Sequence, residues 1–283
     1  MKITRAIIAI AAMSMATGAQ AATIFGVDEL NNLVTIDTAN PATTLSSTRI
    51  TGLSDSIQAL DFRPVNNVLY GLGGDKVVYT INTLTGVATA ASGVLAIAGT
   101  EFGFDFNPTI DRLRIVSNTN ENYVFNPVDG SLTTATPVLY AGGDRNAGRD
   151  ADVTALAYTS STLGAAAGTT QLYGIDISLD TLVRQANSAG TLDTVGSLGV
   201  DVGSRTSFDI AGTDAFAVNG RRLFSVNLGT GAASQVGLID RSLFGIAIST
   251  AVPEPSSWAL MLTGFGAIGI AMRRRRRVSV TFA

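Results

Sequence analysis

Three aspartates occupy equivalent positions in short apolar segments that recur along the chain. Asp61 lies in residues 58–62, Asp105 in residues 102–106 and Asp209 in residues 207–210. Two positions before each aspartate stands a small residue, so in an extended strand both side chains project from the same face. If these segments are the innermost strands of a ring, the three carboxylates converge near its axis. Clustered carboxylates repel one another and favour a hard cation, so the pattern indicates calcium as the one candidate cofactor.

A second interpretation of the same aspartates needs no metal. Each carboxylate would accept hydrogen bonds from backbone N–H groups of a neighbouring strand or turn, because a buried charge must be paired. Structural aspartates are common in repeated strands, and we favour this interpretation over the metal site.

A loop at residues 144–152 carries another set of oxygen ligands. Carboxylates and an amide alternate along it, with Gly148 near the middle, which resembles part of a calcium loop. The loop lacks a final glutamate, and its two arginines neutralise its charge. A solvated connection between strands is therefore the favoured interpretation.

Missing residue types exclude several kinds of chemistry. The chain has no His and no Cys, which rules out Ser-His-Asp and Cys-His nucleophile pairs, histidine metal cages and disulfides. Two-carboxylate glycoside chemistry remains open, but the sequence assigns no catalytic residue.

Seven of the 19 Lys and Arg lie in the terminal segments, so Ala22 to Pro255 carries a net charge of −10. Such an acidic surface argues against nucleic acid as a partner.

Short strand-like segments with β-branched and aromatic residues recur in a four-part unit. The first segments are 58–62, 102–106, 154–158, 207–210 and 244–248. The second are 68–72, 112–116, 171–175, 214–218 and 23–27. The third are 77–81, 122–125, 181–184, 222–226 and 32–36, and a Thr-, Ser- and Ala-rich fourth segment follows each time. Asn and Gly frame the turns after the third segments, as in 82–86, 126–130 and 227–231.

Repeats of roughly 35–55 residues with four strands each are typical of a β-propeller. Five copies therefore predict an all-β fold, a five-bladed β-propeller. The fifth copy is split, because its first strand lies near the C-terminus and its other strands lie near the N-terminus. The two chain ends should therefore complete one blade together and remove an open sheet edge.

The N-terminal 21 residues have the order of a secretory signal peptide. A basic start with Lys2 and Arg5 precedes an apolar run, and Ala19 and Ala21 belong to a small-residue cleavage site, Ala-Gln-Ala, at residues 19–21. Cleavage by signal peptidase after Ala21 leaves Ala22 as the first mature residue.

The C-terminal segment, residues 251–283, has three blocks. Pro253, Glu254 and Pro255 hold the backbone extended, and residues 256–272 form an apolar stretch predicted to be a short transmembrane helix. A basic membrane stop follows, made of Arg273, Arg274, Arg275, Arg276 and Arg277.

This order resembles the PEP-CTERM sorting signal of exported proteins in Gram-negative bacteria. The resemblance implies recognition by the membrane enzyme exosortase, cleavage near Pro-Glu-Pro and transfer towards the cell surface. The alternative is a simple C-terminal membrane anchor.

The body of the chain, placed at residues 22–250, resembles a family of unknown function whose members often carry such tails. The resemblance rests on residues 23–27, 104–108 and 143–148 and covers residues 23–249. It implies no chemistry, because the family has no assigned activity.

Together these features predict an exported protein with a transient inner-membrane anchor and a final place at the cell surface or in the extracellular matrix. The propeller is expected to be a non-enzymatic module that binds a surface polysaccharide or a protein. One alternative is a secreted carbohydrate-active enzyme that uses acidic residues, and another is a purely structural surface component. A propeller fold by itself cannot choose among these functions.

Overall fold

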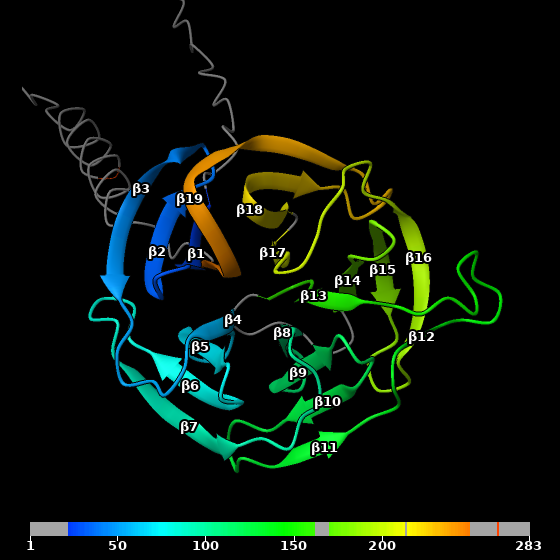
Figure 1. Cartoon of the computed structure of the whole chain (residues 1–283), viewed down its shortest axis with the longest axis horizontal. Helices are drawn as coiled ribbons and strands as arrows, with labels where there is room; N and C mark the ends of the chain where they lie inside the picture. Colours follow the sequence, from blue (N-terminus) through cyan, green and yellow to red (C-terminus); the bar gives the residue numbers. More distant parts are fainter. Residues whose placement is uncertain (1–21, 162–169, 213, 250–264, 266–283) are drawn as a thin grey trace, which may run out of the picture.

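The computed structural model describes residues 22–161, 170–212, 214–249 and 265, and its strands form a propeller-like ring of four sheets. Figure 1 looks down this ring, with β4, β8, β13 and β17 near the centre and β3, β7, β11 and β16 towards the rim. The inner strands are neighbours in the cyclic order β4, β8, β13, β17, β19 and back to β4.

Three of the sheets each follow one of the predicted repeats. The first contains β4 (Ile57–Arg63), β5 (Val68–Gly73), β6 (Val77–Ile81) and β7 (Ala88–Val94). The second contains β8 (Phe102–Asn107), β9 (Arg112–Ser117), β10 (Asn122–Phe125) and β11 (Leu132–Thr134). The third contains β13 (Val153–Tyr158), β14 (Leu172–Asp176), β15 (Thr181–Gln185) and β16 (Thr191–Ser197), and β12 (Leu139–Tyr140) joins its rim parallel to β16.

The fourth sheet has six strands and contains both ends of the described chain. In spatial order they are β17 (Ser207–Ala211), β18 (Asp214–Val226), β19 (Ala233–Ser249), β1 (Thr23–Asp28), β2 (Asn32–Asp37) and β3 (Asn40–Arg49). Strand β1 pairs with β19 in antiparallel register, with Thr23 opposite Ser249. The N-terminal strands and residues 244–248 therefore share one sheet, as the split repeat predicts.

The number of sheets differs from the five predicted blades. The last two strand sets join in one ladder because β18 and β19 are long and change partners along their length. The first part of β18 pairs with β17, and its second part pairs with the first part of β19. The second part of β19 then pairs with β1. Register shifts in β18 near Gly220 accompany this change of partner.

The turns after the third strands form as their Asn and Gly residues predict. The Oδ1 atom of Asn82 accepts hydrogen bonds from the backbone N–H groups of Leu84 and Thr85, both at 3.0 Å. Gly86 closes this turn with a φ of 71°, a region that glycine enters without steric cost. The turn around Asn227 repeats the pattern, and its Gly231 has a φ of 83°.

The core lies between neighbouring sheets, where buried apolar and aromatic side chains interlock. Tyr70 of β5 and Phe106 of β8, for example, meet edge to face with ring centroids 5.0 Å apart. The inner strands come very close together, because a Cβ atom on Gly103 would lie only 2.5 Å from Cγ of Leu156. This close approach explains why small residues recur on the inner strands.

The predicted transmembrane helix at residues 256–272 and the predicted signal peptide at residues 1–21 lie outside the described residues. Among the residues that the structure does describe, no helix is long and apolar enough to cross a membrane.

Candidate functional site

The three predicted aspartates lie close together in the middle of the ring. Asp61 on β4, Asp105 on β8 and Asp209 on β17 each offer a carboxylate oxygen, and these oxygens all lie within 4.8 Å of one another. All three residues are buried, with at most 4% of their surface exposed. The convergence expected from their equivalent positions is therefore present.

Each aspartate also accepts a hydrogen bond from the backbone of another inner strand. Asp61 accepts from the N–H group of Phe106 at 2.6 Å, and Asp105 accepts from that of Tyr158 at 3.0 Å. Asp209 accepts from the N–H group of Ile248 at 2.5 Å. The interpretation that needs no metal is correct on this point, since the carboxylates connect β4 to β8, β8 to β13 and β17 to β19.

Burial and mutual repulsion raise the pKa values of this aspartate cluster. Burial raises the pKa of Asp209 to about 7, although hydrogen bonds from Ile248 and Ile210 oppose the shift. The pKa of Asp61 is raised well above its ordinary range by burial and by the charge of Asp209. Asp105 behaves in the same way, with the charges of both other aspartates adding to burial. The cluster therefore holds protons near neutral pH or requires a cation to neutralise it.

The donor atoms of the cluster suit a hard cation. Carboxylate oxygens are the ligands that calcium prefers, and metal binding would replace the protons that the aspartates otherwise retain. The calcium site stays a prediction, because the observed hydrogen bonds give each aspartate a structural role without it.

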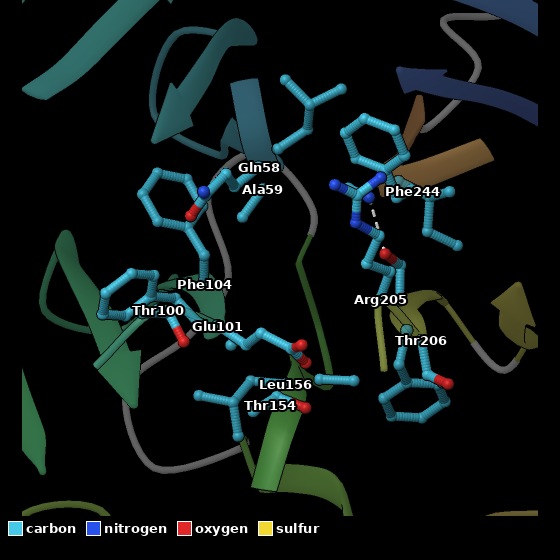
Figure 2. Close-up of a pocket in the computed structure, with 18 of the residues that line it drawn as sticks. Gln58, Ala59, Thr100, Glu101, Phe104, Thr154, Leu156, Arg205, Thr206 and Phe244 are labelled. Atoms are coloured by element: carbon cyan, nitrogen blue, oxygen red, sulfur yellow. Dashed lines mark hydrogen bonds between the residues drawn. The ribbon is translucent and has the colours of Figure 1, made fainter. Parts of the chain in front are cut away.

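A pocket of about 200 Å³ lies where the inner strands begin, and Figure 2 shows it. Three residues of its lining directly precede an aspartate of the cluster: Leu60 on β4, Phe104 on β8 and Phe208 on β17. The aspartate cluster therefore lies one residue further along these strands than the pocket. The wall is part apolar and part polar. The apolar side chains include Phe102, Phe104, Phe208 and Phe244, and the polar ones include Gln58, Thr100, Glu101, Thr154, Arg205 and Thr206.

Two buried side-chain oxygen atoms of this wall have no hydrogen-bond partner among the residues that the structure describes. They are Oγ1 of Thr154, a residue that is only 6% exposed, and Oε1 of Gln58. An unpaired buried polar atom costs about 1–3 kcal/mol. A ligand that donates hydrogen bonds in the pocket would recover this cost.

The pocket also contains two charged side chains of opposite sign. Glu101 precedes β8 and Arg205 precedes β17, and neither forms an ion pair within the described part of the chain. The guanidinium carbon of Arg205 lies 4.8 Å from the centre of the Phe244 ring, which holds the side chain by a cation–π contact. Arg205 has a φ of 60°, an uncommon conformation for a residue with a side chain and one that often marks functional sites.

The repeat pattern indicated the aspartates as site residues but not Glu101, Arg205 or Thr154. Their place in the repeat could have indicated them, because each of these polar residues lies near the start of an inner strand or just before it. In a propeller all such positions meet at one mouth of the ring.

The loop at residues 144–152 has mainly structural contacts. Asp144 accepts hydrogen bonds from the backbone N–H groups of Asn146 and Thr194, at 2.8 and 2.6 Å. Asp150 accepts one from the side-chain amide of Asn120 at 2.7 Å. These contacts agree with the interpretation of a connecting loop, although Oδ1 of Asp152 is buried and unpaired.

The remaining predicted site residues lie outside the described residues. These are the cleavage-site residues Ala19 and Ala21, the motif Pro253 to Pro255 and the arginines from Arg273 to Arg277.

Comparison with known proteins agrees with both resemblances found in the sequence. Residues 251–277 match the PEP-CTERM protein-sorting motif. No curated protein matches the chain. Residues 32–247, most of the ring, match a family described as a domain of unknown function, DUF4394, and the chain therefore belongs to this family.

Proposed function

We propose that this protein is sorted by exosortase to the cell surface or extracellular matrix, where its propeller acts as a non-enzymatic binding module. The PEP-CTERM motif at residues 251–277 supports export and exosortase processing. In this proposal signal peptidase removes residues 1–21, and the segment 256–272 anchors the chain in the inner membrane until it is processed.

The pocket at the ring mouth is the observation that carries the binding role. Within the described part of the chain, it combines unpaired hydrogen-bond acceptors with two charged side chains that have no ion-pair partner. A purely structural component would gain nothing from such groups, because unpaired buried polar atoms only destabilise it. A polysaccharide end or a protein terminus that enters the pocket would be the partner.

A surface-retention experiment tests this proposal. Cells would produce the wild-type chain and the double variant Glu101→Gln, Arg205→Gln, and the amount held at the surface would be measured by immunolabelling. The matched control is Glu29→Gln, Arg49→Gln, which removes the same charges from two exposed positions. We expect the pocket variant to be released into the medium and the control to be retained. Equal retention of all three proteins would contradict the binding role.

A secreted carbohydrate-active enzyme is the second candidate. The observation in its favour is the aspartate cluster, because a buried carboxylic acid with a raised pKa is a suitable general acid. Against it, Glu101 is the one carboxylate among the described residues of the pocket lining, whereas glycoside hydrolysis uses two. Turnover of a polysaccharide by the purified protein, abolished by Asp61→Asn or Asp209→Asn, would favour the enzyme.

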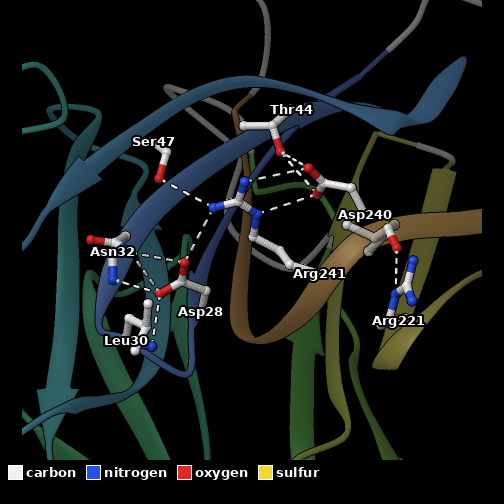
Figure 3. A network of polar contacts seen from close by, with 9 residues as sticks. Asp28, Leu30, Asn32, Thr44, Ser47, Arg221, Asp240 and Arg241 are labelled. Carbon is white, nitrogen blue, oxygen red and sulfur yellow. Dashed lines mark hydrogen bonds and ion pairs between the residues drawn. The ribbon is translucent and has the colours of Figure 1, made fainter.

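We also infer that the ring functions as five blades, with the six-stranded sheet comprising two of them. The cyclic order of five inner strands supports this division, as does the change of partners along β18 and β19. Around the bend of β19, Arg241 contacts Asp28 at 3.3 Å and Ser47 at 3.4 Å (Figure 3). Its neighbour Asp240 accepts hydrogen bonds from Thr44 at 2.9 Å. These contacts would fasten the two chain ends at the point of closure.

A further inference from the structure

The polar groups of the pocket are distributed unevenly around its mouth. Figure 2 shows the Glu101 carboxylate extending into the pocket from the β8 side, and Arg205 beside Phe244 on another side. Burial and the charges of Glu101, Asp176 and Asp150 raise the pKa of Asp152, so this nearby carboxyl group keeps its proton more readily and the negative charge of this side rests on Glu101. The described part of the lining therefore presents one negative group, Glu101, and one positive group, Arg205, on different sides of the pocket.

Among the described residues, the unpaired buried atoms in the pocket lining and in Asp152 beside it are all oxygens. Thr154 and Gln58 line the pocket and carry the buried oxygens Oγ1 and Oε1, and Asp152, with its buried Oδ1, directly precedes β13. Of the two lining oxygens, the amide oxygen of Gln58 can only accept hydrogen bonds, and the hydroxyl of Thr154 can accept as well. A ligand that satisfies them must bring donors, and a primary ammonium brings three donors together with the positive charge that Glu101 favours.

Arg205 fixes the second requirement on the ligand. Its guanidinium packs on Phe244 and has no carboxylate partner in the described chain, so its N–H groups remain able to bind an anion. A guanidinium matches a carboxylate through two parallel hydrogen bonds.

We propose that the pocket binds a small zwitterion, with Glu101 and the neighbouring oxygens holding its ammonium group and Arg205 holding its carboxylate. This inference rests on the proposed binding function and adds a small-molecule ligand for the same pocket, distinct from the surface partner. The simplest such molecule is a free α-amino acid. The cavity of about 200 Å³ admits a molecule of that size and excludes a folded partner.

Thermal shift and calorimetry on the full chain, purified in mild detergent, test the proposal. The probes are a panel of free L-amino acids, and for the tightest binder its N-acetyl derivative, its methyl ester and glucosamine. The N-acetyl derivative lacks the ammonium group, the ester lacks the carboxylate, and glucosamine carries an ammonium group on a sugar. We expect the free amino acid to bind and both derivatives to bind at least tenfold more weakly.

Variants assign the two halves of the site. In Arg205→Gln the amino acid and its ester should bind equally, because the carboxylate has lost its partner. In Glu101→Gln the amino acid and its N-acetyl derivative should bind equally. Glu29→Gln and Arg49→Gln serve as controls that should bind as the wild type does, and unchanged melting of each apo variant shows that it folds.

Three results would overturn the proposal. They are no binding by any amino acid, undiminished binding of either derivative to the wild type, and tighter binding of glucosamine than of any amino acid. The surface-retention experiment distinguishes this failure from failure of the proposed function. If the pocket variant is still released from cells while no amino acid binds, the binding module stands and only the zwitterion is wrong.

Discussion

Replacing Asp209 with asparagine should remove part of the pH dependence of the protein's stability. In the folded chain burial raises the pKa of Asp209 from its ordinary value of 3.8 to about 7. The charge of Asp209 is among the causes that raise the pKa values of Asp61 and Asp105. Asp209 should therefore be the first member of the cluster to lose its proton as the pH rises.

The sign of the effect follows from proton binding. Below pH 3.8 the side chain is protonated in both the folded and the unfolded protein and contributes no pH dependence. Between this pH and about 7 the unfolded protein has released the proton and the folded protein still holds it. The free energy of unfolding then falls by about 1.4 kcal/mol for each pH unit, or roughly 4 kcal/mol in all. Above about pH 7 the contribution of Asp209 is constant.

Asparagine cannot ionise, so the Asp209→Asn variant should lose this slope. It should also lose about 1–3 kcal/mol at every pH, because one of the two N–H groups that Asp209 now binds, from Ile210 and Ile248, would face the amide NH₂. The slope and not the absolute stability is therefore diagnostic.

Urea unfolding, followed by circular dichroism between about pH 4 and about pH 8 with EDTA present, measures this slope. Asp193→Asn, at an exposed position, is the matched control and should keep the wild-type slope. If the wild type shows no fall in stability over this range, or if Asp209→Asn retains the full fall, the reasoning is refuted.

Three further predictions concern the cation, the processing and the ring closure. If the three aspartates share calcium, calcium should raise the melting temperature, and more at pH 8 than at pH 5, because the ion competes with protons; an unmoved melting curve at both pH values would exclude the site. Mass spectrometry of the surface form should show a chain that begins near Ala22 and ends near Pro255, whereas a product that retains Arg273 to Arg277 would indicate a simple anchor. Deleting all residues after Arg241 should lower the melting temperature of the whole ring, because β1 and β4 lose their neighbour in β19; melting like the intact chain would show that closure contributes little.

Local sequence patterns were sufficient to predict most individual strands. Alternating apolar residues and the Asn and Gly turns act over a few residues, so residues 77–81 and 82–86 form the strand and the turn that their sequence predicts. The split repeat likewise predicted the pairing of β1 with β19, because the N-terminal copy lacks a first strand and the C-terminal segment 244–248 supplies it. The number of sheets was not predictable in this way. It depends on whether the backbone of β18 and β19 continues its hydrogen bonding through a bend near Gly220, which no local pattern encodes.

The sequence by itself determined the sorting motif, the absence of His and Cys chemistry and the equivalent positions of Asp61, Asp105 and Asp209, since all of these are properties of residue order. The tertiary structure alone decided that the three carboxylates share one buried cluster and also connect neighbouring strands. It alone placed Glu101, Thr154 and Arg205 around one pocket, because these residues belong to three repeats that are far apart in the chain. The physical reason is ring closure: residues about fifty positions apart become neighbours only when every sheet has packed against the next.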